Sequence, residues 1–147
     1  MKPRDKDFFV AYEVKPMGRF VQYNANPSKN RVGDCTVRAI SKAFGMDWNT
    51  TYVGLCLFGF MACDMPTANT VWGNYLRAHG FVRHLVDDNG QECYTVDDFA
   101  RDHPEGIYVL ALDSHVVAVC SGHYFDTWDC GQETPIYYWE REIKDGK

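Results

Sequence analysis

Residues 107–128 read IYVLALDSHVVAVCSGHYFDTW and contain two apolar runs, at 107–112 and 116–120. Continuous apolar runs rich in branched residues are typical of strands that are buried on both faces of a sheet. Short turns at 113–114 and 121–122 would join these runs to each other and to the segment that follows. The stretch therefore predicts an antiparallel meander.

The turn at 121–122 sets the register of the second hairpin, because only two residues separate its strands. This register places Asp126 opposite Val117. Side chains alternate along a strand, so His115 shares a face with Val117, and Asp126 lies diagonal to His115 and within its reach. Asp129 falls on the opposite face, and a slip of one residue would exchange the two carboxylates. The sequence therefore favours Asp126 over Asp129 as the partner of His115.

The chain before the meander is mainly helical. Apolar residues between Cys35 and Phe44 recur at helical spacing, with Asp34 as the expected N-cap and Gly45 as the stop. Similar patterns predict helices from about 49 or 50 to 60, over 67–79 and after 95, strands at 8–12, 20–23, 81–86, 123–128 and 136–141, a loop at 24–31 and a turn at 87–90. Helices followed by a C-terminal antiparallel sheet indicate an α+β fold, and the length fits a single domain, 1–147.

Composition and charge exclude several classes of function. Lys and Arg total 15 against 20 Asp and Glu, so the formal net charge is −5. A chain of this charge without a basic stripe is a poor candidate for nucleic-acid binding. The longest apolar stretch, 54–63, is too short to span a bilayer, and the N-terminus lacks the apolar core of a signal peptide. We therefore expect a cytoplasmic protein with no nucleic-acid or membrane partner.

The chain has six cysteines, of which Cys35 is the most informative. Disulfides are not expected in a reducing compartment, and no pair has the C-x-x-C spacing of a structural zinc site, so we expect neither metal nor cofactor. Cys35 begins the helix expected at 35–44, where unpaired N–H groups favour the thiolate. The adjacent Asp34 would oppose this effect, so we expect its carboxylate to cap the helix instead.

A nucleophilic thiol needs a base, and the base needs a third group that orients it. His115 opens the most apolar strand and lies at the rim of the expected sheet, with Asp126 within reach. His123, beside the hairpin turn, is the rival base. The sequence therefore predicts a catalytic triad of Cys35, His115 and Asp126. The alternative is an unrelated α+β protein in which the cysteine and the histidine are packing residues.

These motifs resemble those of the papain-like cysteine peptidases. The matching segments are GDCTVRAI at 33–40, HVVAV at 115–119 and DTW at 126–128. In order along the chain they are similar to small bacterial and phage members, and especially to the peptidases that process bacteriocin leaders. The resemblance implies a papain-like fold in which the nucleophile helix packs on the sheet. It also implies that Trp128 shields the bond between the aspartate and the histidine.

One position departs from the papain-like pattern. Where these enzymes usually carry a glutamine that donates to the oxyanion, this chain has Lys29. The backbone N–H of Cys35 would be one donor, and amide side chains nearby are candidates for the other. These oxyanion candidates are Gln22, Asn24, Asn26 and Asn30.

A second resemblance is to the ovarian-tumour type of deubiquitinase, whose cysteine motif also continues to Arg-Ala-Ile. It would point to His123 as the base, although Val32 stands where that family has an aspartate. The leading hypothesis is a cysteine protease or thiol hydrolase that cleaves a peptide or isopeptide bond through a thioester. Its partner would be a peptide or protein substrate, recognised by loops at 61–69 and 86–96. The alternatives are a deubiquitinase-like enzyme and a non-catalytic peptide-binding module on the same fold.

Overall fold

The computed structural model describes residues 16–87 and 93–142. In chain order the elements are η1 (Pro16–Arg19), β1 (Phe20–Gln22), α2 (Cys35–Phe44), α3 (Trp48–Ala62), α4 (Asn69–Ala78), β2 (Phe81–Leu85), α5 (Val96–Asp102), β3 (Ile107–Leu112), β4 (His115–Cys120), β5 (His123–Asp126) and β6 (Pro135–Arg141). The strand expected at 8–12 lies outside the described residues, as does most of the turn expected at 87–90. The remaining expected elements are present, and the fold is mixed α+β.

The six strands form one sheet in the order β1-β5-β4-β3-β6-β2. Strands β3, β4 and β5 form the expected antiparallel meander, and β6 pairs antiparallel with β3. The expectation of a C-terminal antiparallel sheet describes only part of the sheet, which also contains earlier strands and one parallel pair. The early strands β1 and β2 occupy the two edges, and β1 runs parallel to β5. Strand β1 adds to the exposed edge of β5, and β2 adds to the exposed edge of β6, because each edge has unpaired N–H and C=O groups.

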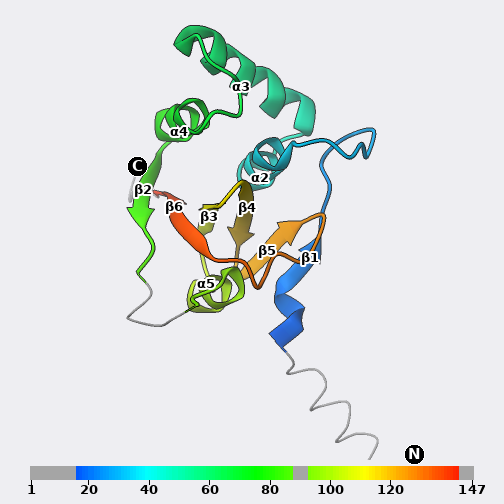
Figure 1. Ribbon diagram of the computed structural model, residues 1–147, viewed down its shortest axis with the longest axis vertical. Coiled ribbons are helices and arrows are strands. Elements are labelled where there is room, and N and C mark those ends of the chain that lie inside the picture. Colours follow the sequence, from blue (N-terminus) through cyan, green and yellow to red (C-terminus); the bar gives the residue numbers. More distant parts are fainter. Residues whose placement is uncertain (1–15, 88–92, 143–147) are drawn as a thin grey trace, which may run out of the picture.

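The sheet is covered on both faces, which gives three layers (Figure 1). Helices α2, α3 and α4 lie on one side, where Ile40 and Trp72 pack against a core that includes Val116 of β4. The short helix α5 lies on the other side, where Phe99 packs in a core that includes Val117. Neighbouring residues of β4 thus face opposite cores. This explains why the central strands read as continuous apolar runs rather than as an alternating pattern.

The β4–β5 hairpin has the predicted register, with Ala118 opposite Phe125 and Cys120 opposite His123. Its turn residues, Ser121 and Gly122, have φ angles of 51° and 80°. Positive φ at both positions is the conformation of a two-residue type I′ turn, which matches the twist of the strands. Continued by one step, this register places Asp126 opposite Val117.

Helix α2 begins at Cys35 and ends at Gly45, whose φ of 66° lets its N–H bond back to the last turn. The expectation that Asp34 caps this helix was wrong, because its side chain makes no capping hydrogen bond. The carboxylate is taken up by other partners, described below. In α3, by contrast, Asp47 accepts a hydrogen bond from the N–H of Thr50, so this helix begins slightly earlier than expected.

None of the described helices combines the length and the apolar character that crossing a membrane requires. All six cysteines lie among the described residues, and each is a free thiol. Cys35 and Cys120 are half-buried, and Cys130 is fully buried.

Candidate active site

The site lies where the start of α2 meets the start of β4. Helix α2 packs on β4, so Cys35, the first residue of the helix, comes next to His115, the first residue of the strand. The thiol and the imidazole lie close enough for each to favour the charged form of the other. The sequence separates these two residues by eighty positions, and the packing of one helix on one strand brings them together.

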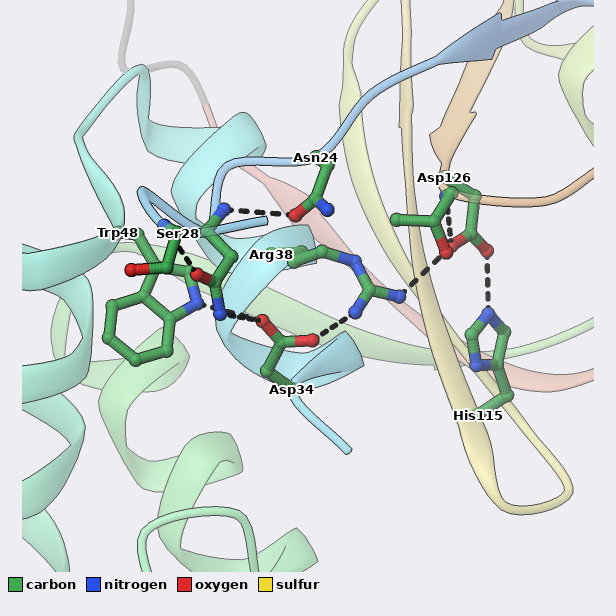
Figure 2. Close-up of polar contacts among 9 residues, drawn as sticks. Asn24, Ser28, Asp34, Arg38, Trp48, His115 and Asp126 are labelled. Carbon is green, nitrogen blue, oxygen red and sulfur yellow. Dashed lines mark hydrogen bonds and ion pairs between the residues drawn. The ribbon is translucent and has the colours of Figure 1, made fainter. Parts of the chain in front are cut away.

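Asp126, at the end of β5, binds the other side of the imidazole. His115 Nε2 lies 2.6 Å from Asp126 Oδ2, as Figure 2 shows. Because Nε2 is engaged by the carboxylate, Nδ1 is the nitrogen that faces the thiol. Asp129 contacts neither group, since its carboxylate accepts hydrogen bonds from the Tyr124 hydroxyl and the Gly131 N–H. The structure thus places Asp126, rather than Asp129, beside His115.

Trp128 lies against the same histidine. The centres of the two rings are 5.0 Å apart, and the planes are tilted by 43°. The indole is 44% exposed, whereas the His115 side chain is only 14% exposed. Trp128 therefore covers one side of the imidazole and keeps water away from it on that side.

Strand β4 extends beyond its neighbour at this end of the sheet. Strand β5 ends at Asp126, opposite Val117, so His115 and Val116 have no partner on β5. The backbone N–H of Val116 lies near the sulfur of Cys35 and lowers the pKa of the thiol. The unequal lengths of the two strands thus leave a backbone donor for a thiolate.

Arg38 links the site to the rest of α2, and sequence reasoning missed its role. Its guanidinium is buried and bridges two carboxylates (Figure 2). Nη2 lies 3.1 Å from Asp126 Oδ1, and Nη1 forms an ion pair with Asp34. The guanidinium therefore holds the oxygen of Asp126 that His115 does not use. The separation of Asp34 from Arg38 by four residues is typical of a helical ion pair and was the available signal.

Asp34 in turn connects the site to the preceding loop and to α3. Its Oδ2 accepts hydrogen bonds from Asn26 Nδ2 at 3.2 Å and from the Trp48 indole N–H at 3.0 Å. The carboxylate therefore points away from the first turn of α2. Because it does not cap the helix, the first N–H groups of α2 remain available beside Cys35.

The electrostatic shifts at the site favour a charged pair. Burial alone raises the pKa of the Cys35 thiol, but hydrogen bonds from His115 and Val116 and the charges of His115 and Arg38 hold that pKa below its usual value. Burial alone lowers the pKa of His115, but the carboxylate of Asp126 and the sulfur of Cys35 raise it to about 9. The two pKa values shift in opposite directions, so the surroundings favour a thiolate beside an imidazolium more than water would.

Cys130 completes the surroundings of Asp126 and was also missed. Burial alone raises the pKa of Asp126, but hydrogen bonds from His115, from the Thr127 N–H and from the Cys130 thiol lower that pKa overall. Burial and the nearby Asp126 raise the pKa of the Cys130 thiol. The Cys130 thiol is therefore expected to stay neutral, and it stabilises the carboxylate of Asp126.

Three of these groups could in principle hold a metal ion. Donor atoms of His115, Asp126 and Cys130 lie within 4.8 Å of one another. Imidazole, carboxylate and thiolate are all zinc ligands. However, the guanidinium of Arg38 lies beside Asp126 and opposes a second cation, and the donors already bond to one another. The arrangement fits a hydrogen-bonded triad better than a metal centre.

Cys35 and His115 lie in an open cleft with two arms that meet at them. The first, here called the polar arm, has a volume of about 660 Å³ and is lined by the 29–33 segment and by Gln22, Asn24, Thr127 and Trp128. The second arm has a volume of about 490 Å³ and is lined by Thr67, Asn69, Leu112, Asp113, Ile136 and Tyr137, among others. The 61–69 loop thus contributes as expected, whereas none of the described residues of 86–96 lines either arm.

The four oxyanion candidates have different positions. Asn26 is buried, its amide donates to Asp34, and it does not line the cleft. Gln22 lines the cleft, but its amide donates to the carbonyl of Thr127. Asn24 and Asn30 line the polar arm, and their amide N–H groups make no hydrogen bond with the described residues. These two are the remaining side-chain candidates.

The other histidines lie away from the thiol. His123 Nδ1 contacts the carbonyl of Ser121 in its own turn, at the opposite end of β4 from His115. His79 and His103 bond to helix carbonyls, and His84 lies near Glu140. The base suggested by the deubiquitinase resemblance is therefore not the imidazole that contacts Cys35.

Comparisons of this chain with protein-family models, with curated proteins and with solved structures gave no match. The likeness to papain-like peptidases therefore rests on the motifs quoted above, and the chemistry of the site rests on its geometry.

Proposed function

We propose that this protein is a thiol hydrolase or acyl transferase of the papain-like kind, acting on a peptide or isopeptide bond. Cys35 is the nucleophile, His115 the base and acid, and Asp126 the group that orients the imidazole. One observation carries the proposal: at an open cleft, a thiol lies beside an imidazole that is hydrogen-bonded to a buried carboxylate. Shifted pKa values of this kind are concentrated at sites that perform acid–base chemistry.

Acylation would begin from the charged pair. The Cys35 thiolate attacks the carbonyl carbon of the scissile bond, and the carbonyl π electrons move to the oxygen. When this intermediate collapses, the C–N bond breaks and the proton of His115 passes to the leaving amine. The products are the free amine, a thioester on Cys35 and a neutral imidazole.

Deacylation would reverse these roles. A water molecule, or an acceptor amine in a transferase, attacks the thioester while His115 takes its proton. The C–S bond then breaks, and the thiolate and the imidazolium are restored. Asp126 stabilises each imidazolium and holds the ring so that Nδ1 faces the sulfur.

The oxyanion would be stabilised at the start of α2. The backbone N–H of Cys35, the first residue of α2, is one donor. An amide of Asn24 or Asn30 is the second donor. Removing one such donor from a thiol or serine hydrolase costs about 100- to 1000-fold in rate.

The experiment that tests the proposal measures the reactivity of each cysteine and the turnover of an ester. Iodoacetamide near neutral pH should alkylate Cys35 much faster than Cys120, a half-buried thiol whose pKa burial raises. Hydrolysis of p-nitrophenyl acetate should be lost in Cys35→Ala and retained in the matched control Cys120→Ala.

Two results would contradict the proposal. Equal, slow alkylation of Cys35 and Cys120 would show that the thiol is not activated. Fast alkylation of Cys35 together with identical ester turnover in the parent and Cys35→Ala would show a reactive thiol without catalysis. The second result would favour the alternative of a peptide-binding module on this fold.

A further inference from the structure

The two arms of the cleft differ in charge. The polar arm is lined by Lys29 and Arg31, both exposed, and by no carboxylate of the described residues. The second arm is lined by a single charged residue of its own, Asp113, together with apolar groups that include Ile136, which is 54% exposed. A ligand that lies along the whole cleft would therefore meet two cations on one side of Cys35 and a wall with no cation and one carboxylate on the other.

No carboxylate of the described residues neutralises the charges of Lys29 and Arg31. Lys29 Nζ donates to the carbonyl of Asn24 at 2.7 Å, which holds the ammonium at the wall of the cleft without neutralising it. Neither Lys29 nor Arg31 forms an ion pair with a described residue. Arg38, by contrast, lines the same arm but is neutralised by Asp34 and Asp126.

The local charge runs against the overall charge of the protein. The chain carries 15 basic and 20 acidic residues. A part of the cleft that is lined by cations and by no carboxylate is therefore not expected from the composition alone. Two cations are also too few for a nucleic acid, whose binding requires many phosphate contacts. Amide donors at Asn24 and Asn30 line the same arm and suit carboxylate oxygens.

We infer that the polar arm binds an acidic side chain of a peptide, while the second arm binds an uncharged part of the same peptide. This inference rests on the proposed function and names its substrate class. The carboxylate lies between Lys29 and Arg31, and the bond to be cleaved lies at Cys35, where the two arms meet. Specificity therefore comes from the 29–33 segment.

A matched pair of small thiol reagents tests the charge of the arm. Iodoacetate and iodoacetamide have nearly the same size and differ by one negative charge. The ratio of their second-order rates at Cys35 should fall roughly fivefold in the variant Lys29→Gln/Arg31→Gln, because two nearby charges no longer attract the anion. The ratio should be unchanged in the control Arg77→Gln/Arg141→Gln, which removes two exposed cations that do not line the cleft.

Peptide binding to Cys35→Ala tests the ligand class without requiring turnover. Fluorescein-labelled hexapeptides of alternating Glu-Ala and Gln-Ala are compared by anisotropy, alongside a labelled single-stranded oligonucleotide. The Glu peptide should bind at least fivefold more tightly than the Gln peptide, and Lys29→Gln/Arg31→Gln should abolish the difference.

An unchanged rate ratio in the Lys29→Gln/Arg31→Gln variant, or equal binding of the two peptides, would overturn the inference. Tighter binding of the oligonucleotide than of the Glu peptide would also overturn it. These outcomes are distinct from failure of the proposed function, which is read from the absolute iodoacetamide rate of Cys35 and from ester turnover.

Discussion

At the scale of single residues, Asp34 has the greatest effect on how the site is built. Its position next to Cys35 would raise the pKa of the thiol if the carboxylate faced the sulfur, and the sequence predicts that it caps α2. Instead it binds Arg38, Trp48 and Asn26, so its charge is matched by the guanidinium and directed away from the first turn. The start of α2 therefore keeps both its free N–H groups and its preference for a thiolate.

Arg38 is expected to position Asp126 and to tune Cys35 by its charge. Arg38→Met leaves two buried carboxylates without their cation and should lower the free energy of unfolding by about 3 kcal/mol or more. It should also move the acid limb of Cys35 alkylation to higher pH, because the guanidinium lowers the thiol pKa. Arg38→Lys should restore part of this pH shift.

The control for Arg38 is Lys42→Met, which removes a cation from the same helix that does not contact Asp126. Iodoacetamide rates as a function of pH, together with urea unfolding, measure both effects. An acid limb at the same pH in the parent, Arg38→Met and Arg38→Lys would show that Arg38 has only a structural role.

The pH profile of kcat/KM for ester hydrolysis should be bell-shaped. The acid limb reports formation of the Cys35 thiolate, and the alkaline limb, near pH 9, reports loss of the proton of His115. Asp126→Asn should move the alkaline limb to lower pH, since the carboxylate raises the pKa of the imidazole. Asp129→Asn should leave the alkaline limb at its original pH. A shift of equal size in both variants would contradict the role of Asp126 as the carboxylate that raises the pKa of His115.

At the scale of elements, the β4–β5 hairpin fixes the position of Asp126 relative to His115. Gly122→Ala should lower the free energy of unfolding by about 1 kcal/mol, because its φ is 80° and a Cβ would lie 3.2 Å from Pro104 Cα. Ser121→Gly should raise it, because Ser121 adopts a positive φ of 51°. Urea unfolding measures the free energy of unfolding of both variants. A change of the same sign in the two variants would contradict the turn geometry.

The elements were predictable wherever the signal was local. The helical spacing of 35–44 and the two-residue turn at 121–122 gave the bounds of α2 and the register of the hairpin, since both depend on neighbours in sequence. The parallel pairing of β1 with β5 was not predictable, because it joins Phe20 to Tyr124. The sequence of a short strand does not indicate which distant strand it will pair with.

The candidate site also contains residues that local patterns predict and contacts that they do not. Cys35, His115 and Asp126 could be proposed from a helix start, a strand start and a hairpin register. The contact of Arg38 with Asp126 spans 88 residues and depends on how α2 lies over the sheet, so no local pattern contains it. The charge of the polar arm likewise depends on how the 29–33 segment folds back over Cys35.

At the scale of the whole molecule, the His115–Asp126 pair should make stability depend on pH. The pKa of His115 is raised from 6.5, so its contribution is fully present below pH 6.5 and is lost as pH rises through the folded pKa. The lowered thiol pKa acts in the opposite sense over this range, so Cys35→Ala is the suitable background. There, the imidazole pKa is still raised by Asp126.

Unfolding in urea between pH 6 and pH 10 measures this effect. The difference in stability between Cys35→Ala and Cys35→Ala/His115→Gln should shrink steadily as pH rises. A difference that stays constant over this range would mean that the pKa of His115 is the same in the folded and unfolded chains.

The chain between β1 and α2 is held by hydrogen bonds at both ends, and its middle part, 29–33, lines the cleft. Its first residues hydrogen-bond to the end of β5, and Asn26 binds Asp34 where the loop enters the helix. Cys35, His115 and Asp126, by contrast, lie on α2, β4 and β5. Under the proposed function, mutations between 27 and 33 would change which peptide the cleft binds without altering Cys35, His115 or Asp126, so this short span is where related proteins would be free to diverge.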